Sequence, residues 1–351
     1  MNSSLSPLLS LPGAVSGDGI DAPVAAHYGS FNVEQRTLVA GNGFVDLSHR
    51  GVVRVSGPDR LPWLHSLTTQ HLETLQPGVP TAALVLSPNG HVEHAMYGVD
   101  DGEAFAAHVE PGEAAPLAAW LDRMRFMMRV EVEDLSEELA VAWRPVPVVE
   151  GTVGGGTAVE GTTPVERTVI EERAQRASRN HFADQGKYDV FFRSELGAYA
   201  QAAGPACGMW AFEALRIARG EPRLGLDTDQ RTIPNEMGWI PSAVHLDKGC
   251  YRGQETVARV HTLGRPPRRL TLLHLDGSDN RLPKRGAPVL NGEREVGFVG
   301  SSARHYELGP IALALLKRNV PVDAQLDADG LPAMQEVVVD PEVGLHVRPR
   351  R

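Results

Sequence analysis

Cysteine is scarce in this chain: its 351 residues include only two cysteines, Cys207 and Cys250. A disulfide-stapled scaffold needs several cysteine pairs, and a zinc or iron–sulfur cage made of thiolates needs four ligands. One chain of this composition can build neither. So few cysteines favour a cytoplasmic protein.

Long hydrophobic runs are also missing. The longest, such as Ile311–Leu316, are far shorter than the roughly 20 residues that a transmembrane helix needs. Residues 1–20 contain neither lysine nor arginine and lack the positively charged region that opens a signal peptide. We therefore expect no membrane partner, a cytoplasmic location, and a disordered lead-in over residues 1–23.

Positive charge is in the minority, since 34 lysines and arginines face 44 aspartates and glutamates and leave a formal net charge of −10. Such a balance argues against a protein that coats nucleic acid. With 42% hydrophobic and 22% charged residues, the composition is that of a folded protein. The length suggests two or three domains, each large enough to bury its own core.

Short strands alternate with helical patterns over residues 51–140. Two strand-like runs in this region, Thr81–Leu86 and Val92–Val99, are separated by a turn that contains Asn89 and Gly90. Asn-Gly is the strongest short-range signal for a β-hairpin. The order strand, helix, hairpin, strand, helix predicts an α+β layer with antiparallel pairing.

The second half of the chain changes in texture. Residues 145–163 are glycine-rich, which is typical of a surface loop or linker. Residues 206–219 and 253–263 carry helical patterns, and the irregular stretch Gly225–Gly249 between them is long enough to be a candidate functional loop. Beyond Arg268, short strands alternate regularly with turns, and this spacing predicts a small β-barrel.

The densest chemical information lies in residues 248–255, Lys-Gly-Cys-Tyr-Arg-Gly-Gln-Glu. The two glycines allow a tight turn, and the helix predicted to follow presents unpaired N–H groups toward it. A thiol at a helix N-terminus beside Lys248 and Arg252 is expected to ionise more readily than usual. A lone cysteine is more often a small buried hydrophobe. A reactive Cys250 and a plain loop-to-helix joint therefore both remain open.

This segment is also locally basic. Six lysines and arginines and one glutamate lie between Lys248 and Arg269, which gives a local charge of +5 inside a chain of net charge −10. The contrast predicts an anion-binding surface for a polyglutamate tail, a phosphate or an RNA backbone.

Residues 248–255 match every fixed position of the signature KGCYxGQE, which identifies the YgfZ family of folate-binding proteins. That family is associated with tRNA modification and with the assembly of 4Fe–4S proteins. Residues 213–220 and 233–236 resemble the stretches that lead to the signature. Residues 27–29 and 45–48 resemble the N-terminus of the wider aminomethyltransferase superfamily, which includes the T-protein of glycine cleavage. The resemblance covers roughly residues 24–345.

The resemblance implies an α+β fold in which three lobes form a ring, with a tetrahydrofolate site in or beside the central channel. Two α+β domains would be intertwined in sequence, and a C-terminal β-barrel would close the ring. We expect residues 24–50 and 141–265 to form the first, folate-binding domain. Residues 51–140 would form the second domain, and residues 266–351 the barrel.

The resemblance also implies a site and a cofactor, tetrahydrofolate or a one-carbon derivative of it. The residues that would carry the chemistry belong to the signature: Lys248, Cys250, Tyr251 and Gln254. The residues that would contact folate are Trp210, Phe212, Arg216, Glu236, Arg252 and Glu93. Ordinary alternatives remain open for several of them, such as core packing for the aromatic residues, a solvated helix position for Arg216, and a capped backbone N–H for Glu236.

One part of the sequence departs from the T-protein pattern. Adjacent aspartates follow the hairpin turn in T-proteins and position the folate nitrogen for methylene transfer. The equivalent positions here are His94 and Ala95, and the nearest carboxylate belongs to Glu93. A carboxylate at that point serves as an acid–base partner of the reacting amine, so either Glu93 replaces it or the transfer is lost. His91 and His94 fall on opposite faces of a strand, so no metal site is expected there.

Three functions compete on these grounds, and whether the protein is an enzyme remains open. The leading one is a tetrahydrofolate-binding protein that supports assembly or repair of 4Fe–4S clusters in client enzymes, with Cys250 as the reactive group. The second is a folate-dependent aminomethyltransferase or methyltransferase of the T-protein type. The third is a non-catalytic module that binds RNA or protein through the basic segment. The expected partners are folate, iron–sulfur client proteins, and tRNA or tRNA-modifying enzymes, and we expect a monomer.

Overall fold

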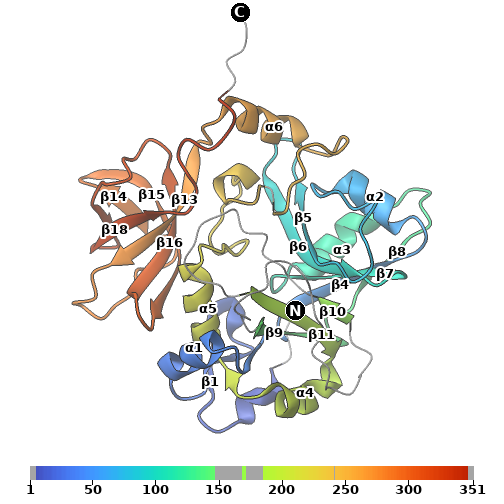
Figure 1. Cartoon of the computed structure of the whole chain (residues 1–351), viewed down its shortest axis with the longest axis horizontal. Helices are drawn as coiled ribbons and strands as arrows, with labels where there is room; N and C mark the ends of the chain where they lie inside the picture. The colour runs from blue at the N-terminus through green and yellow to red at the C-terminus, as the bar shows by residue number, and fades with distance from the viewer. Residues whose placement is uncertain (1–4, 147–167, 171–184, 241, 347–351) are drawn as a thin grey trace, which may run out of the picture. The chain divides into compact units, whose positions relative to one another are not determined.

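The computed structural model (Figure 1) describes residues 5–146, 168–170, 185–240 and 242–346. The lead-in predicted to be disordered is ordered from residue 5 onward and contains a 3-10 turn, η1 (Pro7–Ser10). Leu8 in this turn is only 5% exposed because it packs in a core with Phe44, so the prediction is wrong for these residues. The predicted glycine-rich linker lies outside the described residues, apart from its first two positions.

Contacts divide the chain into two compact units, each assembled from three stretches of sequence. The first unit comprises Met1–Pro58, Gln76–Thr81 and Tyr97–Met209. The second comprises Asp59–Leu75, Ala82–Met96 and Trp210–Arg351. The domain boundaries and the ring arrangement expected from the sequence remain predictions.

The first unit contains a sheet with the strand order β10-β11-β9-β3-β12. Its strands are β3 (Phe44–Asp46), β9 (Leu139–Val146), β10 (Thr168–Ile170), β11 (Gln185–Phe192) and β12 (Ala206–Cys207). The pairs are antiparallel except β12–β3, which is parallel. The same unit contains β1 (Val15–Ser16), β2 (Ala25–His27), α1 (Phe31–Val39), α4 (Leu196–Ala203), η2 (Gly19–Asp21) and η3 (Arg193–Glu195).

A second sheet has the strand order β5-β6-β7-β4-β8. Its strands are β4 (Gly51–Ser56), β5 (Thr81–Leu86), β6 (Val92–Asp100), β7 (Ala104–Val109) and β8 (Glu131–Asp134). Helix α3 (Ala114–Arg123) packs beside β4 and β8. A side chain at Gly51 would place its Cβ 2.5 Å from the Cβ of Ala114, so glycine is what allows the helix to approach. The predicted hairpin is confirmed, because β5 and β6 are neighbours and Gly90 supplies the positive φ of the turn.

The C-terminal strands form a closed barrel with the order β13-β16-β15-β14-β17-β18, drawn in orange to red in Figure 1. The strands are β13 (Arg268–Leu275), β14 (Pro288–Asn291), β15 (Arg294–His305), β16 (Gly309–Lys317), β17 (Leu326–Ala328) and β18 (Leu331–Val337). Leu273, Val299 and Ala314 belong to a buried cluster of this barrel. The predicted fold class, α+β with a C-terminal β-barrel, is confirmed.

One hydrophobic core of the second unit positions the segments that matter for function. It joins the barrel to two helices, α5 (Met209–Ala218) and α6 (Gln254–Leu263), and to the hairpin strands. Its members include Leu84, Leu86, Val92, Ala214, Ile217, Trp239, Tyr251, Val257, Leu270 and Leu313. The segment with the KGCYRGQE signature is therefore anchored in a core that elements distant in sequence share.

Candidate functional site

Residues 248–253, which we call the signature loop, lead directly into α6 at Gln254. The loop ends at Gly253, whose φ of +80° lies in the left-handed region. A Cβ on Gly253 would lie 2.6 Å from the carbonyl oxygen of Ser87, and a Cβ on Gly90 would lie 2.7 Å from the Cβ of Thr256. The hairpin turn and the start of α6 therefore interlock through two glycines.

Lys248 anchors the start of the signature loop. Its ammonium is buried and donates hydrogen bonds to the carbonyl oxygens of His65 and, at 2.5 Å, Thr68. These carbonyls lie at the C-terminal end of α2 (Arg60–Leu67), where a cation stabilises the unpaired carbonyl groups and the helix dipole. Burial lowers the pKa of Lys248 to about 8. The side chain therefore joins the signature loop to a helix far away in the sequence.

Tyr251 and Gln254 complete the anchoring. The ring of Tyr251 is 8% exposed, belongs to the core of the second unit, and lies 5.1 Å from the Lys248 Nζ atom. Burial raises the pKa of Tyr251 to about 12. The side-chain amide of Gln254 donates to the carbonyl oxygen of Lys248 at 3.4 Å. Three of the four signature residues predicted to be catalytic thus hold the loop in place, and their catalytic roles remain predictions.

The two cysteines have opposite environments. Cys250 is exposed, between the buried anchors Lys248 and Tyr251. Cys207 is 1% exposed, its thiol faces the carbonyl oxygen of Glu34 at 3.6 Å, and burial raises its pKa to about 12. The fold therefore presents the Cys250 thiol to solvent and encloses that of Cys207.

Glu93 and Arg252 meet across the hairpin and the signature loop. The Nη1 atom of Arg252 lies 2.9 Å from Oε2 of Glu93, and Nη2 lies 3.5 Å from Oε1. Both side chains are about one-third exposed, at 35% and 36%. The residue at one of the T-protein aspartate positions, Ala95, is buried. The structure thus brings Glu93 to the signature loop, with its carboxylate engaged by a guanidinium.

Glu236 lies in a short 3-10 turn, η4 (Pro234–Glu236), and is fully buried. Its carboxylate accepts two hydrogen bonds from Arg268, each at 2.8 Å, and a third from the backbone N–H of Ile233 at 3.1 Å. The same guanidinium bonds Asp229 at 2.6 Å. Burial alone would raise the pKa of Asp229, but hydrogen bonds from Arg268 and Thr232 lower this pKa to about 2. Glu236 therefore has a complete structural role, and its predicted folate contact remains a prediction.

Arg216 is the centre of a buried ionic network and is not a solvated helix residue. The Nε group and one N–H of Nη2 donate to the carboxylate of Glu213. One N–H of Nη1 donates to Asp227 at 3.0 Å. The remaining two bonds reach the carbonyl oxygen of Glu221 and the hydroxyl of Ser301. A guanidinium has five N–H groups, and these contacts use all of them. These contacts leave no N–H of Arg216 for a ligand, and its folate contact remains a prediction.

The two aromatic candidates on α5 differ in exposure, because they lie two residues apart on the helix. Phe212 is 3% exposed and Trp210 is 46% exposed. Core packing accounts for Phe212, whereas nearly half of the surface of Trp210 is exposed to solvent.

Asn235 is a residue that the sequence analysis did not single out. It is 7% exposed, and its Oδ1 atom accepts no hydrogen bond from any of the described residues. A buried acceptor without a donor is costly unless a ligand or a water supplies one. Its place between Pro234 and Glu236, in one of the stretches shared with the resembling family, was the signal that could have identified it.

The basic residues between Lys248 and Arg269 form no patch of unpaired charge in the described parts of the chain. Lys248 and Arg269 are buried. The acidic partners of the others are Glu93 for Arg252, Glu342 for Arg265, and Asp229 with Glu236 for Arg268. Residues distant in sequence therefore neutralise most of the local charge, and the anion-binding surface stays a prediction. Arg259 remains exposed.

Comparison with a solved structure identifies the class of fold. The chain has the fold of the glycine cleavage system aminomethyltransferase T from Bartonella henselae, with a TM-score of 0.75 at 18% sequence identity over 96% of both chains. Among curated proteins, it is 27% identical to the aminomethyltransferase of Rubrobacter xylanophilus, over 83% of this chain and 79% of that one. It is 22% identical to the aminomethyltransferase of Bacillus pumilus, over 85% of each chain. No family model matches the chain. Over the described residues, no helix is long and apolar enough to cross a membrane.

Proposed function

We propose that this protein binds a reduced folate and presents the Cys250 thiol to client enzymes that contain 4Fe–4S clusters, supporting assembly or repair of those clusters. The observation that carries the proposal is the construction of the signature loop. Lys248 and Tyr251 are buried on either side of an exposed Cys250. A loop fixed at both ends holds its thiol in one place at the surface. A thiol held in this way is suited to act as a transient ligand to the cluster iron of a client protein.

The residues present fit a folate in part. The amino-pyrimidine edge of a pterin carries N–H donors, and the unpaired buried Oδ1 of Asn235 is an acceptor of the required kind. The exposed part of the Trp210 side chain would provide an aromatic wall. Arg252, about one-third exposed, would be a cation for the glutamate tail, which would compete with Glu93 for the guanidinium. When bound, tetrahydrofolate would supply a carrier for a one-carbon unit.

Two features favour this function over aminomethyl transfer. The two T-protein aspartate positions are occupied by His94 and Ala95, so neither carries a carboxylate. The nearest carboxylate, that of Glu93, forms an ion pair with Arg252 at 2.9 Å, and a general base must be able to reach the reacting amine.

Folate-dependent aminomethyl transfer is nevertheless the second candidate, because the curated relatives quoted above bear that name. In that function Glu93 would leave Arg252 and take the place of the missing aspartate. Substrate binding could break such an ion pair, because exposed pairs contribute little to stability.

The two candidates make different predictions for one pair of assays. Deletion of the gene should lower the activities of 4Fe–4S enzymes in the host, and the wild-type gene should restore them. The purified protein, given tetrahydrofolate and an aminomethyl-lipoyl carrier, should form no methylene-tetrahydrofolate. Unchanged 4Fe–4S activities after deletion would exclude the proposed function. Methylene-tetrahydrofolate formation that is lost in Glu93→Gln would establish the second candidate instead.

A further inference from the structure

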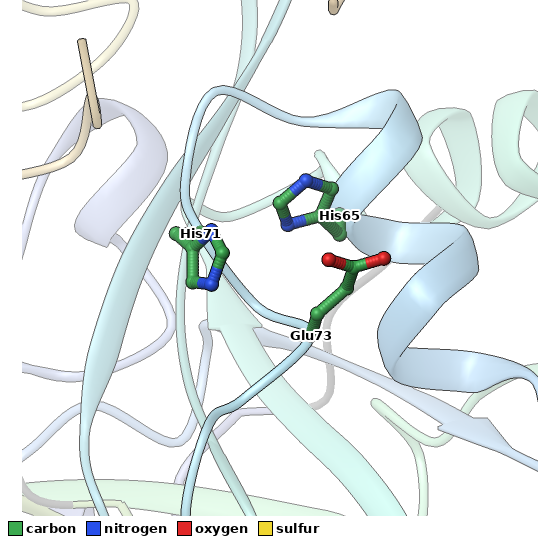
Figure 2. A group of neighbouring side chains, drawn as sticks. All are labelled: His65, His71 and Glu73. Atoms are coloured by element: carbon green, nitrogen blue, oxygen red, sulfur yellow. The ribbon is translucent and has the colours of Figure 1, made fainter. Parts of the chain in front are cut away.

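A second group of chemically active side chains lies in residues 65–73, next to the signature loop. His65 comes from the last turn of α2, and His71 and Glu73 come from the connection that follows it. One ligand atom from each of the three lies within 4.8 Å of the others (Figure 2). We infer that His65, His71 and Glu73 form a binding site for a divalent transition-metal ion of the zinc type.

The local structure explains why these side chains converge. Leu72 is fully buried and fixes the connection between its two neighbours, His71 and Glu73. Thr69 holds the same connection from the other end, because its hydroxyl donates to the carbonyl oxygen of Ala243 at 2.6 Å. Figure 2 shows the side chains of His71 and Glu73 directed toward His65. The backbone is thus held by buried residues while the three ligand groups face one another.

The donor set has a definite preference. Two imidazoles and one carboxylate are the protein ligands of several catalytic zinc sites, in which further positions stay open for water or substrate. Magnesium and calcium prefer shells made of oxygen atoms alone. The rings of His65 and His71 lie 4.7 Å apart at 84°, and the ring of His245 lies 5.3 Å from that of His71. His245 is exposed and could supply a fourth ligand.

Two contacts of His65 oppose the binding of a metal ion. The backbone N–H of Leu72 donates to Nδ1 of His65 at 3.2 Å. Coordination through Nε2 places the proton of the neutral ring on Nδ1, so this long hydrogen bond has to be given up. The Lys248 ammonium also lies close, bound to the carbonyl oxygen of His65, and its charge repels a cation. The carboxylate of Glu73 supplies the compensating negative charge, which makes Glu73 essential to the site.

The inference is independent of the proposed function, and its test needs no activity. The full chain, freed of metal with a chelator, is titrated with Zn²⁺ in competition with a chromophoric chelator. We expect one zinc ion per chain and a loss of affinity of at least about tenfold in both His71→Ala and Glu73→Gln. His274→Ala is the matched control, because it removes a histidine paired with Glu336 at 2.8 Å elsewhere in the same unit. This control should bind zinc like the wild type.

Two further measurements distinguish zinc bound by the histidines from zinc bound by the exposed thiol. Cys250→Ala should keep the zinc affinity of the wild type, whereas loss in that variant would assign the zinc to the thiol and overturn the inference. Co²⁺ bound to the wild type should show visible absorption bands that weaken in His71→Ala and not in His274→Ala. Wild-type affinity in His71→Ala and Glu73→Gln, or no zinc bound by the wild type, would also overturn it. Circular dichroism confirms that the variants are folded, as expected for a half-buried His71 and an exposed Glu73.

Discussion

Gly253 offers a sharp test of how the signature loop is held, because the loop contains a second glycine in a different environment. Gly253 has a φ of +80°, and an added Cβ would lie 2.6 Å from the carbonyl oxygen of Ser87. Gly249 has a φ outside the left-handed region, is exposed, and would meet no atom within 4 Å. Alanine at the two positions therefore makes the same chemical change with different physical consequences.

The expected cost follows from two contributions. An alanine in the left-handed conformation costs about 1 kcal/mol or more. Relief of the overlap with the backbone of Ser87 requires a shift of the hairpin turn or of α6, and overpacking of this kind costs about 1–3 kcal/mol. Gly253→Ala should therefore lower the free energy of unfolding by about 2–4 kcal/mol. Gly249→Ala should change it by less than about 0.5 kcal/mol, or raise it slightly by restricting the unfolded chain.

Urea unfolding of the full chain, followed by tryptophan fluorescence, measures the difference. Trp239 lies in the same core as Tyr251 and reports on the unit that contains the loop. Equal urea midpoints for Gly253→Ala and Gly249→Ala would refute the interlocking of the hairpin turn with the start of α6.

Three further outcomes are expected. Because burial lowers the pKa of Lys248 to about 8 in the folded protein, the unfolded chain binds more protons than the folded one above that pH. The free energy of unfolding should therefore rise by about 1–2 kcal/mol between pH ~8 and ~10. Lys248→Met should lack this rise in urea midpoint, and a pH profile identical to that of the wild type would contradict the burial of Lys248. Arg216→Met should lower the free energy of unfolding in urea by about 3–5 kcal/mol, because it leaves the acidic partners of Arg216 buried and unpaired. Arg259→Met, at an exposed position, should lower it by less than about 0.5 kcal/mol. Equal losses in the two variants would contradict the buried ionic network. An aromatic disulfide reagent should titrate the Cys250 thiol in the native protein and the Cys207 thiol only in urea, and rapid native labelling of Cys207→Ala and Cys250→Ala alike would contradict the assigned exposures.

The parts of the structure that the sequence predicted are those governed by local signals. Asn89 and Gly90 specify a hairpin through the conformation of the turn itself, and the short strands beyond Arg268 specify a barrel through their spacing. The start of α6 near Gly253 was likewise predicted from glycine and from the helical pattern that follows it. The lead-in was missed because the burial of Leu8 depends on Phe44, which no local pattern reveals.

The roles of charged residues were the least predictable from the sequence. The carbonyl groups that bind Lys248 belong to residues about 180 positions earlier in the chain. Arg216 reaches a hydroxyl on the barrel that is 85 positions away. Local counting of charges cannot detect such partners, so the basic segment was predicted as exposed although most of it is paired. The cluster of His65, His71 and Glu73 was missed for a related reason, since no familiar ligand spacing marks it.

The measurement that tests the central claim most directly compares the two cysteines in a host whose own copy of the gene has been deleted. The activity of a 4Fe–4S enzyme is assayed after complementation with Cys250→Ala and with Cys207→Ala, at equal levels of the two proteins. If the signature loop serves to present the Cys250 thiol, Cys207→Ala restores the activity and Cys250→Ala leaves it at the level of the deletion. Equal restoration by the two variants would contradict the account.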